Sequence, residues 1–191
     1  MKTTNELSIY SVERIVDQLK SKLSAKGYNV VFIDNKSELN SFIKKCIPEN
    51  KNVCLGDIKN LSELDIDTAL IDNNNPLFIY SGNKINPKKA DYFVSAVDAI
   101  TEDGDIIYIE KDKNNQAKKF RETKNIVALA GINKITKNIE HGMWRIKNII
   151  VPQKSREDNL GAPCQQPGFC VDCTSNNSLC NEVNIFKTKP D

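Results

Sequence analysis

Short strands alternate with amphipathic helices in the first part of the sequence, and this alternation constrains the fold more than any other feature. Apolar side chains recur at helical spacing over residues 6–24, and the β-branched segment YNVVFI (28–33) predicts a strand. A second helix is predicted over residues 37–46, and NVCLGD (52–57) predicts the next strand. The order predicts an α/β protein with a mainly parallel sheet flanked by helices.

The second half of the sequence continues this pattern. DYFVSAVDAI (91–100) and DIIYIE (105–110) predict two strands, and Asp103-Gly104 between them is a hairpin signal. NIVALA (125–130) is the near-continuous apolar run of a strand inside a parallel sheet, and residues 136–150 return to helical spacing. Weaker patterns predict a helix over 114–124 and only short elements and loops over 61–87.

A change of composition divides the chain near Pro152. Apolar residues make up 39% of all 191 residues but become sparse beyond Pro152, where polar residues, Pro and Gly dominate. We therefore expect an α/β domain over residues 1–152 and a cysteine-rich tail over residues 153–191.

Charge and hydropathy narrow the classes of partner. The formal net charge of +2 gives no basic surface of the kind that binds nucleic acid. The first residues lack the apolar core of a signal peptide, and no segment approaches the about 20 apolar residues of a membrane span. We expect a cytoplasmic protein with no membrane span and no nucleic-acid partner.

Four cysteines fall within one polar segment, GAPCQQPGFCVDCTSNNSLC, with the spacing C-x5-C-x2-C-x6-C. Too few apolar residues lie between them to form a core, so something else has to order the segment. A metal could, since structural zinc contributes about 10–16 kcal/mol of apparent binding energy in small peptides. A four-thiolate iron–sulfur cluster is equally compatible with this set of ligands. The predicted metal ligands are Cys164, Cys170, Cys173 and Cys180.

Disulfides or free thiols are the alternatives for these four side chains. Cys46 and Cys54 are different, because each lies on the apolar side of a predicted element and is expected to pack in the core. His141, which is the single histidine, is expected on a solvated helix face rather than in a catalytic site.

Motifs in the last half of the chain resemble the LUD domain family, the lactate utilisation proteins of the LutC and YkgG type. The resemblance rests on DAITEDG (98–104), on GINKI (131–135) and on the four-cysteine tail, and it is closest to a short subgroup that carries such a tail. It implies a fold similar to the NagB/RpiA/CoA-transferase type. It also implies a role in lactate utilisation beside iron–sulfur and flavin-linked partners.

Segments 55–59, 98–101 and 131–134 each follow a predicted strand, so we expect them to meet at one end of the sheet and form a ligand pocket. Its candidate residues are Gly56, Asp57, Asp98, Thr101, Asn133 and Lys134. GDIK (56–59) stands where the family has a glycine- and serine-rich loop, and Asp98 stands where the family has Asn. Because two carboxylates repel phosphate, we expect weak or absent binding of phosphorylated ligands.

Three functions remain open at this stage. The first is an accessory or electron-transfer component of a redox complex linked to lactate or small organic acid metabolism, with a [4Fe–4S] cluster as cofactor and a redox complex or a second copy as partner. The second is an enzyme acting on a small organic acid or sugar phosphate, with structural zinc in the tail. The third is a structural protein whose zinc fastens the tail. Iron is favoured over zinc because only Cys170 and Cys173 form a close-spaced pair, and because the family context is redox chemistry.

Overall fold

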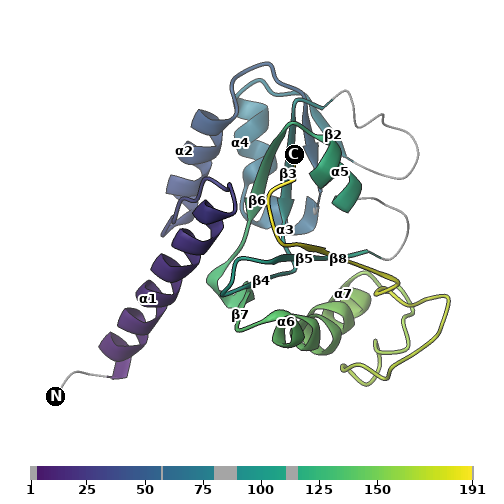
Figure 1. Ribbon diagram of the computed structural model, residues 1–191. Coiled ribbons are helices and arrows are strands. Elements are labelled where there is room, and N and C mark those ends of the chain that lie inside the picture. The colour runs from purple at the N-terminus through teal and green to yellow at the C-terminus, as the bar shows by residue number, and fades with distance from the viewer. Residues whose placement is uncertain (1–3, 57, 80–89, 111–115, 191) are drawn as a thin grey trace. The chain divides into compact units, whose positions relative to one another are not determined.

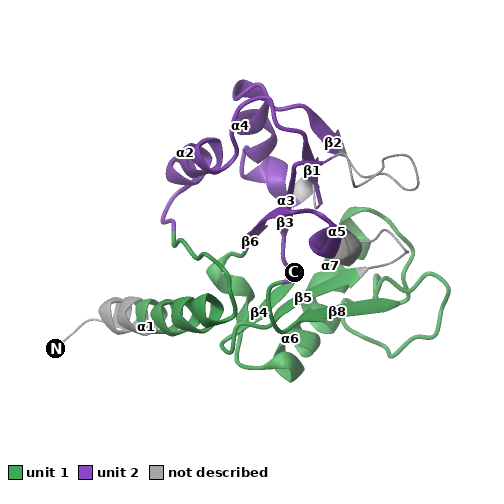
Figure 2. Cartoon of the chain, turned by 45° about the horizontal axis from the view of Figure 1, so that its top comes forward, with its two compact units in different colours: residues 1–32, 98–112, 130–189 green, residues 33–97, 113–129, 190–191 purple. Residues whose placement is uncertain are grey.

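The computed structural model describes residues 4–56, 58–79, 90–110 and 116–190 (Figure 1). Its contacts divide the chain into two compact units, which Figure 2 distinguishes by colour. Unit 1 comprises residues 1–32, 98–112 and 130–189, and unit 2 comprises residues 33–97, 113–129 and 190–191. Pro152, the expected boundary, lies within a helix of unit 1, and the chain stays in unit 1 on both sides of it.

Unit 2 contains a four-stranded sheet with helices on both faces. Its strands are β1 (Val53–Leu55), β2 (Leu77–Ile79), β3 (Tyr92–Ala96) and β6 (Asn125–Leu129). Its helices are α2 (Lys36–Cys46), α3 (Ile58–Glu63), α4 (Ile66–Asp72) and α5 (Gln116–Glu122). The strand order is β2-β1-β3-β6 and every pairing is parallel, so the predicted fold class is confirmed.

The two faces of this sheet are covered by different helices. Alternate residues of a strand point to opposite faces. Val53, Leu55 and Val94 point to the face covered by α2, α3 and α4, where they form a core with Ile43, Leu61 and Leu70. Cys54 and Phe93, which are register partners, point to the other face, where α5 lies (Figure 1).

Unit 1 contains a second four-stranded sheet. Its strands are β4 (Ala99–Thr101), β5 (Ile106–Glu110), β7 (Ile135–Thr136) and β8 (Glu182–Phe186), in the order β7-β4-β5-β8. Strands β4 and β5 are antiparallel, as the Asp103-Gly104 signal predicted, and Gly104 turns the chain with a φ of 79°. The pairing of β8 with β5, which was not predicted, brings the end of the tail into the sheet.

A long helical stretch covers one face of this second sheet (Figure 1). It consists of α6 (Ile139–Arg145), the π-helical turn η4 (Ile146–Ile150) and α7 (Val151–Glu157). Unit 1 also contains α1 (Thr4–Ala25) and the short 3-10 turn η3 (Ile132–Lys134). Ile146 and Val151 of the helical stretch form a core with Ala99 and Ile107 of the sheet.

Two sequence predictions need correction. YNVVFI (28–33) is not a strand: Val31 and Phe32 are about half exposed, and the segment pairs with no other strand that the structure describes. The strand predicted over residues 125–130 forms as β6 (Asn125–Leu129), but β6 lies at the edge of the sheet, and Ala128 is exposed. The expectation of short elements over residues 61–87 is confirmed where the structure describes them, since α3, α4 and β2 have six, seven and three residues. Leu61 of α3 and Leu70 of α4 are fully buried.

Among the helices that are described, none is both long and apolar enough to cross a lipid bilayer.

Candidate metal centre

The first half of the cysteine segment is held against α7 by hydrogen bonds. Ser155 Oγ donates to Gln165 Oε1 at 2.9 Å, and Arg156 Nε donates to the carbonyl oxygen of Gln165 at 2.6 Å. The backbone N–H of Ala162 donates in turn to Ser155 Oγ at 3.2 Å. Side chains of α7 therefore help to order residues 161–168, since they form hydrogen bonds with the polar groups of this segment.

Two of the four cysteines are fixed by the core of unit 1. Cys164 is buried, and it packs with Ala162 and Leu179 against the cluster that contains Ile107 and Ile146. Cys180 is partly buried against the same cluster. Its sulfur lies 3.5 Å from Ser178 Oγ, which also accepts a hydrogen bond from the Cys180 N–H. Both ends of the cysteine segment are therefore anchored to the fold.

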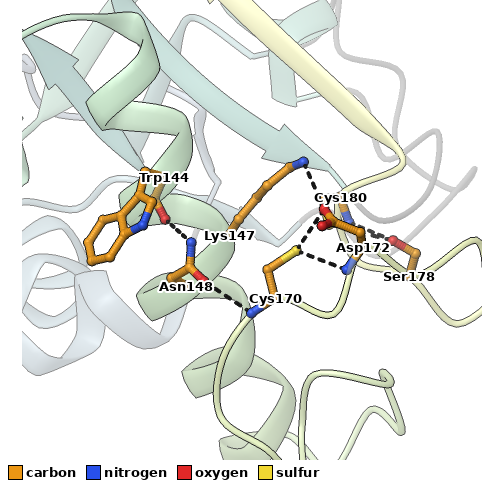
Figure 3. Close-up of polar contacts among 7 residues, drawn as sticks. All are labelled: Trp144, Lys147, Asn148, Cys170, Asp172, Ser178 and Cys180. Carbon is orange, nitrogen blue, oxygen red and sulfur yellow. Dashed lines mark hydrogen bonds and ion pairs between the residues drawn. The ribbon is translucent and has the colours of Figure 1, made fainter.

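Cys170 is held by the π-helical turn η4 (Figure 3). Its backbone N–H donates to Asn148 Oδ1 at 3.2 Å, and Asn148 Nδ2 donates to the carbonyl oxygen of Trp144 at 2.9 Å. A π-helical turn shifts the side chains that follow it around the helix axis, and such turns are frequent at functional sites. Here the turn presents Asn148 to the cysteine segment.

Polar groups also surround the Cys170 sulfur itself. The Asp172 N–H donates to this sulfur at 3.4 Å, and the thiol lies 3.6 Å from Asp172 Oδ1, as Figure 3 shows. Lys147 Nζ forms an ion pair with the same carboxylate at 3.8 Å. Asp172 has a φ of 45°, the left-handed conformation, so the chain turns sharply between Cys170 and Cys173.

All six cysteines are free thiols in this structure. Burial raises the pKa of the Cys164 thiol, and the negative charges of Cys180, Cys173 and Cys170 raise it further. A cation bound among these sulfurs would remove this repulsion. Nevertheless, within the part of the chain that is described, no three His, Cys, Asp or Glu side chains lie close enough together to hold a metal ion. The donor chemistry fits a metal centre, whereas coordination requires the segment that carries Cys170 and Cys173 to move.

The candidate pocket residues fall in both units. Asp98 accepts a hydrogen bond from the Ile109 N–H at 2.8 Å, and Thr101 Oγ1 accepts one from the Asp105 N–H at 3.0 Å, so both side chains fasten the β4–β5 hairpin. Burial lowers the pKa of the Arg145 guanidinium. The charge of the Asp98 carboxylate opposes this effect but is the smaller of the two.

Asn133 and Lys134 lie in η3, directly before β7, which pairs with β4. Unit 1 therefore brings the segments 98–101 and 131–134 together. Gly56 follows β1 in unit 2, and Asp57 lies outside the described residues. Ligand binding by these six residues stays a prediction.

The sequence predictions missed an open cavity of about 500 Å³ on α2. It is lined by Lys36, Ser37, Asn40, Ser41, Lys44 and Asp65, none of which belongs to the expected pocket. Lys36 pairs with Asp65 at 2.6 Å, and Lys44 pairs with Asp72 at 3.5 Å. No motif marks this surface, because lysines and serines at helical spacing are typical of any solvated helix face.

The fold and the free thiols define an α/β protein with a parallel sheet flanked by helices and a cysteine-rich segment beside a second sheet. The LUD domain family matches residues 16–189, which include all four tail cysteines, and the chain belongs to this family. Comparison with curated proteins gave no match.

Two solved structures show how far the likeness of fold extends. The crystal structure of a DUF162 family protein from Deinococcus radiodurans aligns with a TM-score of 0.57 at 9% identity, over 92% of this chain and 87% of that chain. Ribose 5-phosphate isomerase from Plasmodium falciparum aligns with a TM-score of 0.33 at 11% identity, over 54% of this chain and 52% of that chain. The second overlap is too low for a conclusion about fold, so the narrower likeness to the NagB/RpiA/CoA-transferase type stays a prediction.

Proposed function

We propose that this LUD domain protein binds one metal centre through Cys164, Cys170, Cys173 and Cys180, and that the centre is a [4Fe–4S] cluster. The observation that carries the proposal is that Cys164 and Cys180, near the two ends of the four-cysteine segment, both pack against the core of unit 1. Four thiolates and no histidine suit iron–sulfur clusters and zinc alike. The single close-spaced cysteine pair and the redox context of the family favour the cluster.

Binding would use the two halves of the segment differently. Cys164 and Cys180 are already fixed by the core of unit 1. Cys170 and Cys173 lie on a more exposed stretch, whose Asp172 side chain is 89% exposed. Movement of this stretch toward the two anchored thiols would complete the set of ligands. The N–H of Asp172 is already placed to donate to the Cys170 sulfur, and hydrogen bonds to ligating sulfurs tune the reduction potential of a cluster.

An iron–sulfur cluster exchanges single electrons, so the protein would serve as an accessory or electron-transfer component of a redox complex that handles lactate or a small organic acid. The ligand thiols must be reduced for the centre to form, which suits a reducing compartment such as the cytoplasm. The partner would be another protein of that complex or a second copy of this chain.

Metal analysis of protein purified without oxygen tests this proposal. We expect brown protein with iron and sulfide each at about four per chain. Cys173→Ser should remove the colour and the iron. Cys46→Ser changes a half-buried thiol outside the tail and should leave both unchanged, which makes it the matched control. Colourless protein with one zinc per chain would select the structural alternative, and metal-free protein with four titratable tail thiols would refute the metal centre.

A further inference from the structure

Four large apolar side chains of unit 1 are exposed near Cys170. Trp144 and Ile149 lie on the helical stretch formed by α6 and η4. Phe169 and Val171 lie on either side of Cys170 in the cysteine segment. Trp144 is 61% exposed and Phe169 is 56% exposed, although aromatic side chains of this size are mostly buried in folded proteins. We refer to these four side chains as the apolar patch.

Hydrogen bonds hold the two halves of the apolar patch beside each other (Figure 3). Asn148 Oδ1 accepts a hydrogen bond from the Cys170 N–H at 3.2 Å, and Asn148 Nδ2 donates to the carbonyl oxygen of Trp144 at 2.9 Å. One side chain therefore joins the backbone of the cysteine segment to the backbone of Trp144. Ile149 follows Asn148 directly in η4. The four apolar side chains thus belong to one surface rather than to separate places on unit 1.

One charge of each sign is exposed at the same place. Lys147 Nζ and Asp172 Oδ1 are 3.8 Å apart, and the two side chains are 41% and 89% exposed. Arg145, the remaining charged residue of the two stretches, has one guanidinium nitrogen fully buried. Charges of a single sign would favour a partner of opposite charge, whereas adjacent opposite charges complement the same surface turned by a two-fold rotation. In such a pair, Lys147 of each copy faces Asp172 of the other.

The apolar patch has the composition of the centre of a protein–protein interface. Aromatic residues are enriched in such centres, tryptophan is among the residues that contribute most to binding, and polar residues form the rim. A specific dimer buries about 800 Å² on each copy, and one buried aromatic side chain supplies about 150–250 Å² of this area. Trp144 and Phe169 would form the centre of the contact, with Lys147 and Asp172 at its edge.

We propose that the apolar patch is the interface of a two-fold symmetric dimer, in which it packs against the same patch of a second copy of this chain. The interface would bury side chains that a single copy leaves in water, and it would bring the Cys170 stretches of both copies together. It uses no cysteine sulfur and no metal. The inference therefore goes beyond the proposed metal centre, and either of the two can fail without the other.

Sedimentation equilibrium of the full-length protein tests this proposal. The protein is kept reduced and in the presence of a metal chelator, so that neither a disulfide nor a bridging metal joins two copies. We expect a reversible dimer with a dissociation constant on the order of 10 µM or lower, since interfaces of standard size bind in the micromolar range or more tightly. Trp144 is the only tryptophan of the sequence. Its fluorescence emission should therefore shift to shorter wavelength over the same range of protein concentration, as the ring leaves water.

Two substitutions of exposed apolar residues locate the interface. Trp144→Gln should raise the dissociation constant by at least about 30-fold, the effect of removing a central interface residue. Ile132→Gln is the matched control, because Ile132 is a similarly exposed apolar residue of unit 1 (55%) that lies outside the apolar patch. This variant should dimerise like the wild type.

Charge reversal tests the two-fold pairing. Lys147→Glu and Asp172→Lys each place like charges opposite each other and should each weaken the dimer. A mixture of the two variants restores opposite charges across the interface and should form a mixed dimer. Wild-type protein that stays monomeric at about 200 µM, far above the expected dissociation constant, would leave the patch to a different partner and overturn the proposal. A dimer in which the Trp144 emission does not shift, or a mixture of the two charge variants that stays monomeric, would overturn it as well.

Discussion

Gly56 lies where β1 ends and its backbone approaches β3. Its N–H donates to the carbonyl oxygen of Val94 at 2.8 Å. A Cβ atom at this position would lie 2.5 Å from Ser95 Oγ and 3.0 Å from Phe93 Cζ, closer than such contacts normally are. Ser95 is fully buried, so its side chain has little room to move. Packing alone therefore requires a glycine here, apart from any part that Gly56 has in binding a ligand.

Gly56→Ala should accordingly destabilise unit 2. We expect the free energy of unfolding to fall by about 1–3 kcal/mol, the usual cost of overpacking a core, in chemical denaturation followed by circular dichroism. Gly131→Ala is the control: there the only close atom is Asn133 Oδ1 at 2.7 Å, on an exposed side chain that can rotate away. Equal losses in the two variants would show that crowding against Ser95 is not the cause.

At the scale of single elements, the success of the sequence predictions depended on whether a segment carries its own signal. The helical spacing over residues 6–24 is complete within the segment, and α1 confirms it. YNVVFI (28–33) has strand-forming residues, but a strand also needs a partner, and local sequence cannot supply that information. The spacing of the four cysteines identified the candidate site. Their contact with Asn148 could not be predicted, because it depends on the π-helical turn η4.

Strand β8 could not be predicted either, because it forms by pairing with β5, which is distant in sequence. Two of its side chains allow a test of this pairing. Phe186 packs its ring edge-on against Tyr108 of β5, with ring centroids 6.1 Å apart, and is 9% exposed. Its neighbour Ile185 points to the opposite face and is 38% exposed.

Phe186→Ala should cost about 3 kcal/mol of unfolding free energy, because it leaves a cavity beside Tyr108. Ile185→Ala in the same strand should cost at most about 1 kcal/mol, since its side chain is already partly in water. Urea denaturation of the two variants and the wild type measures both losses. A larger loss for Ile185→Ala than for Phe186→Ala would mean that β8 does not pack on β5 in this register.

At the scale of the whole chain, unit 1 is assembled from segments that are distant in sequence. The end of α1 meets the last residues: the Lys189 N–H donates to the Lys26 carbonyl oxygen at 3.2 Å, and the Tyr28 hydroxyl donates to the Thr188 carbonyl oxygen at 3.2 Å. Lys26 also pairs with Asp105 of the hairpin at 2.5 Å. These contacts join the start, the middle and the end of the chain within unit 1, which also contains the cluster that holds Cys164 and Cys180.

This closure should be sensitive to alkaline pH through Tyr28. Burial raises the pKa of its phenol from 10.0 to about 12, so the folded state favours the neutral, hydrogen-bonded form. The resulting stabilisation is fully present below pH 10 and is lost as the pH rises through about 12.

Tyr28→Phe lacks the hydroxyl and should be less stable than wild type by roughly 0.5–1.5 kcal/mol below that range, the usual contribution of one hydrogen bond. Because only the wild type has this phenol to ionise, the difference between the two denaturation curves should shrink between pH 10 and 12. A difference between Tyr28→Phe and wild type that stays constant across that interval would show that the phenol does not titrate with folding, and that the contact with Thr188 does not help to close unit 1.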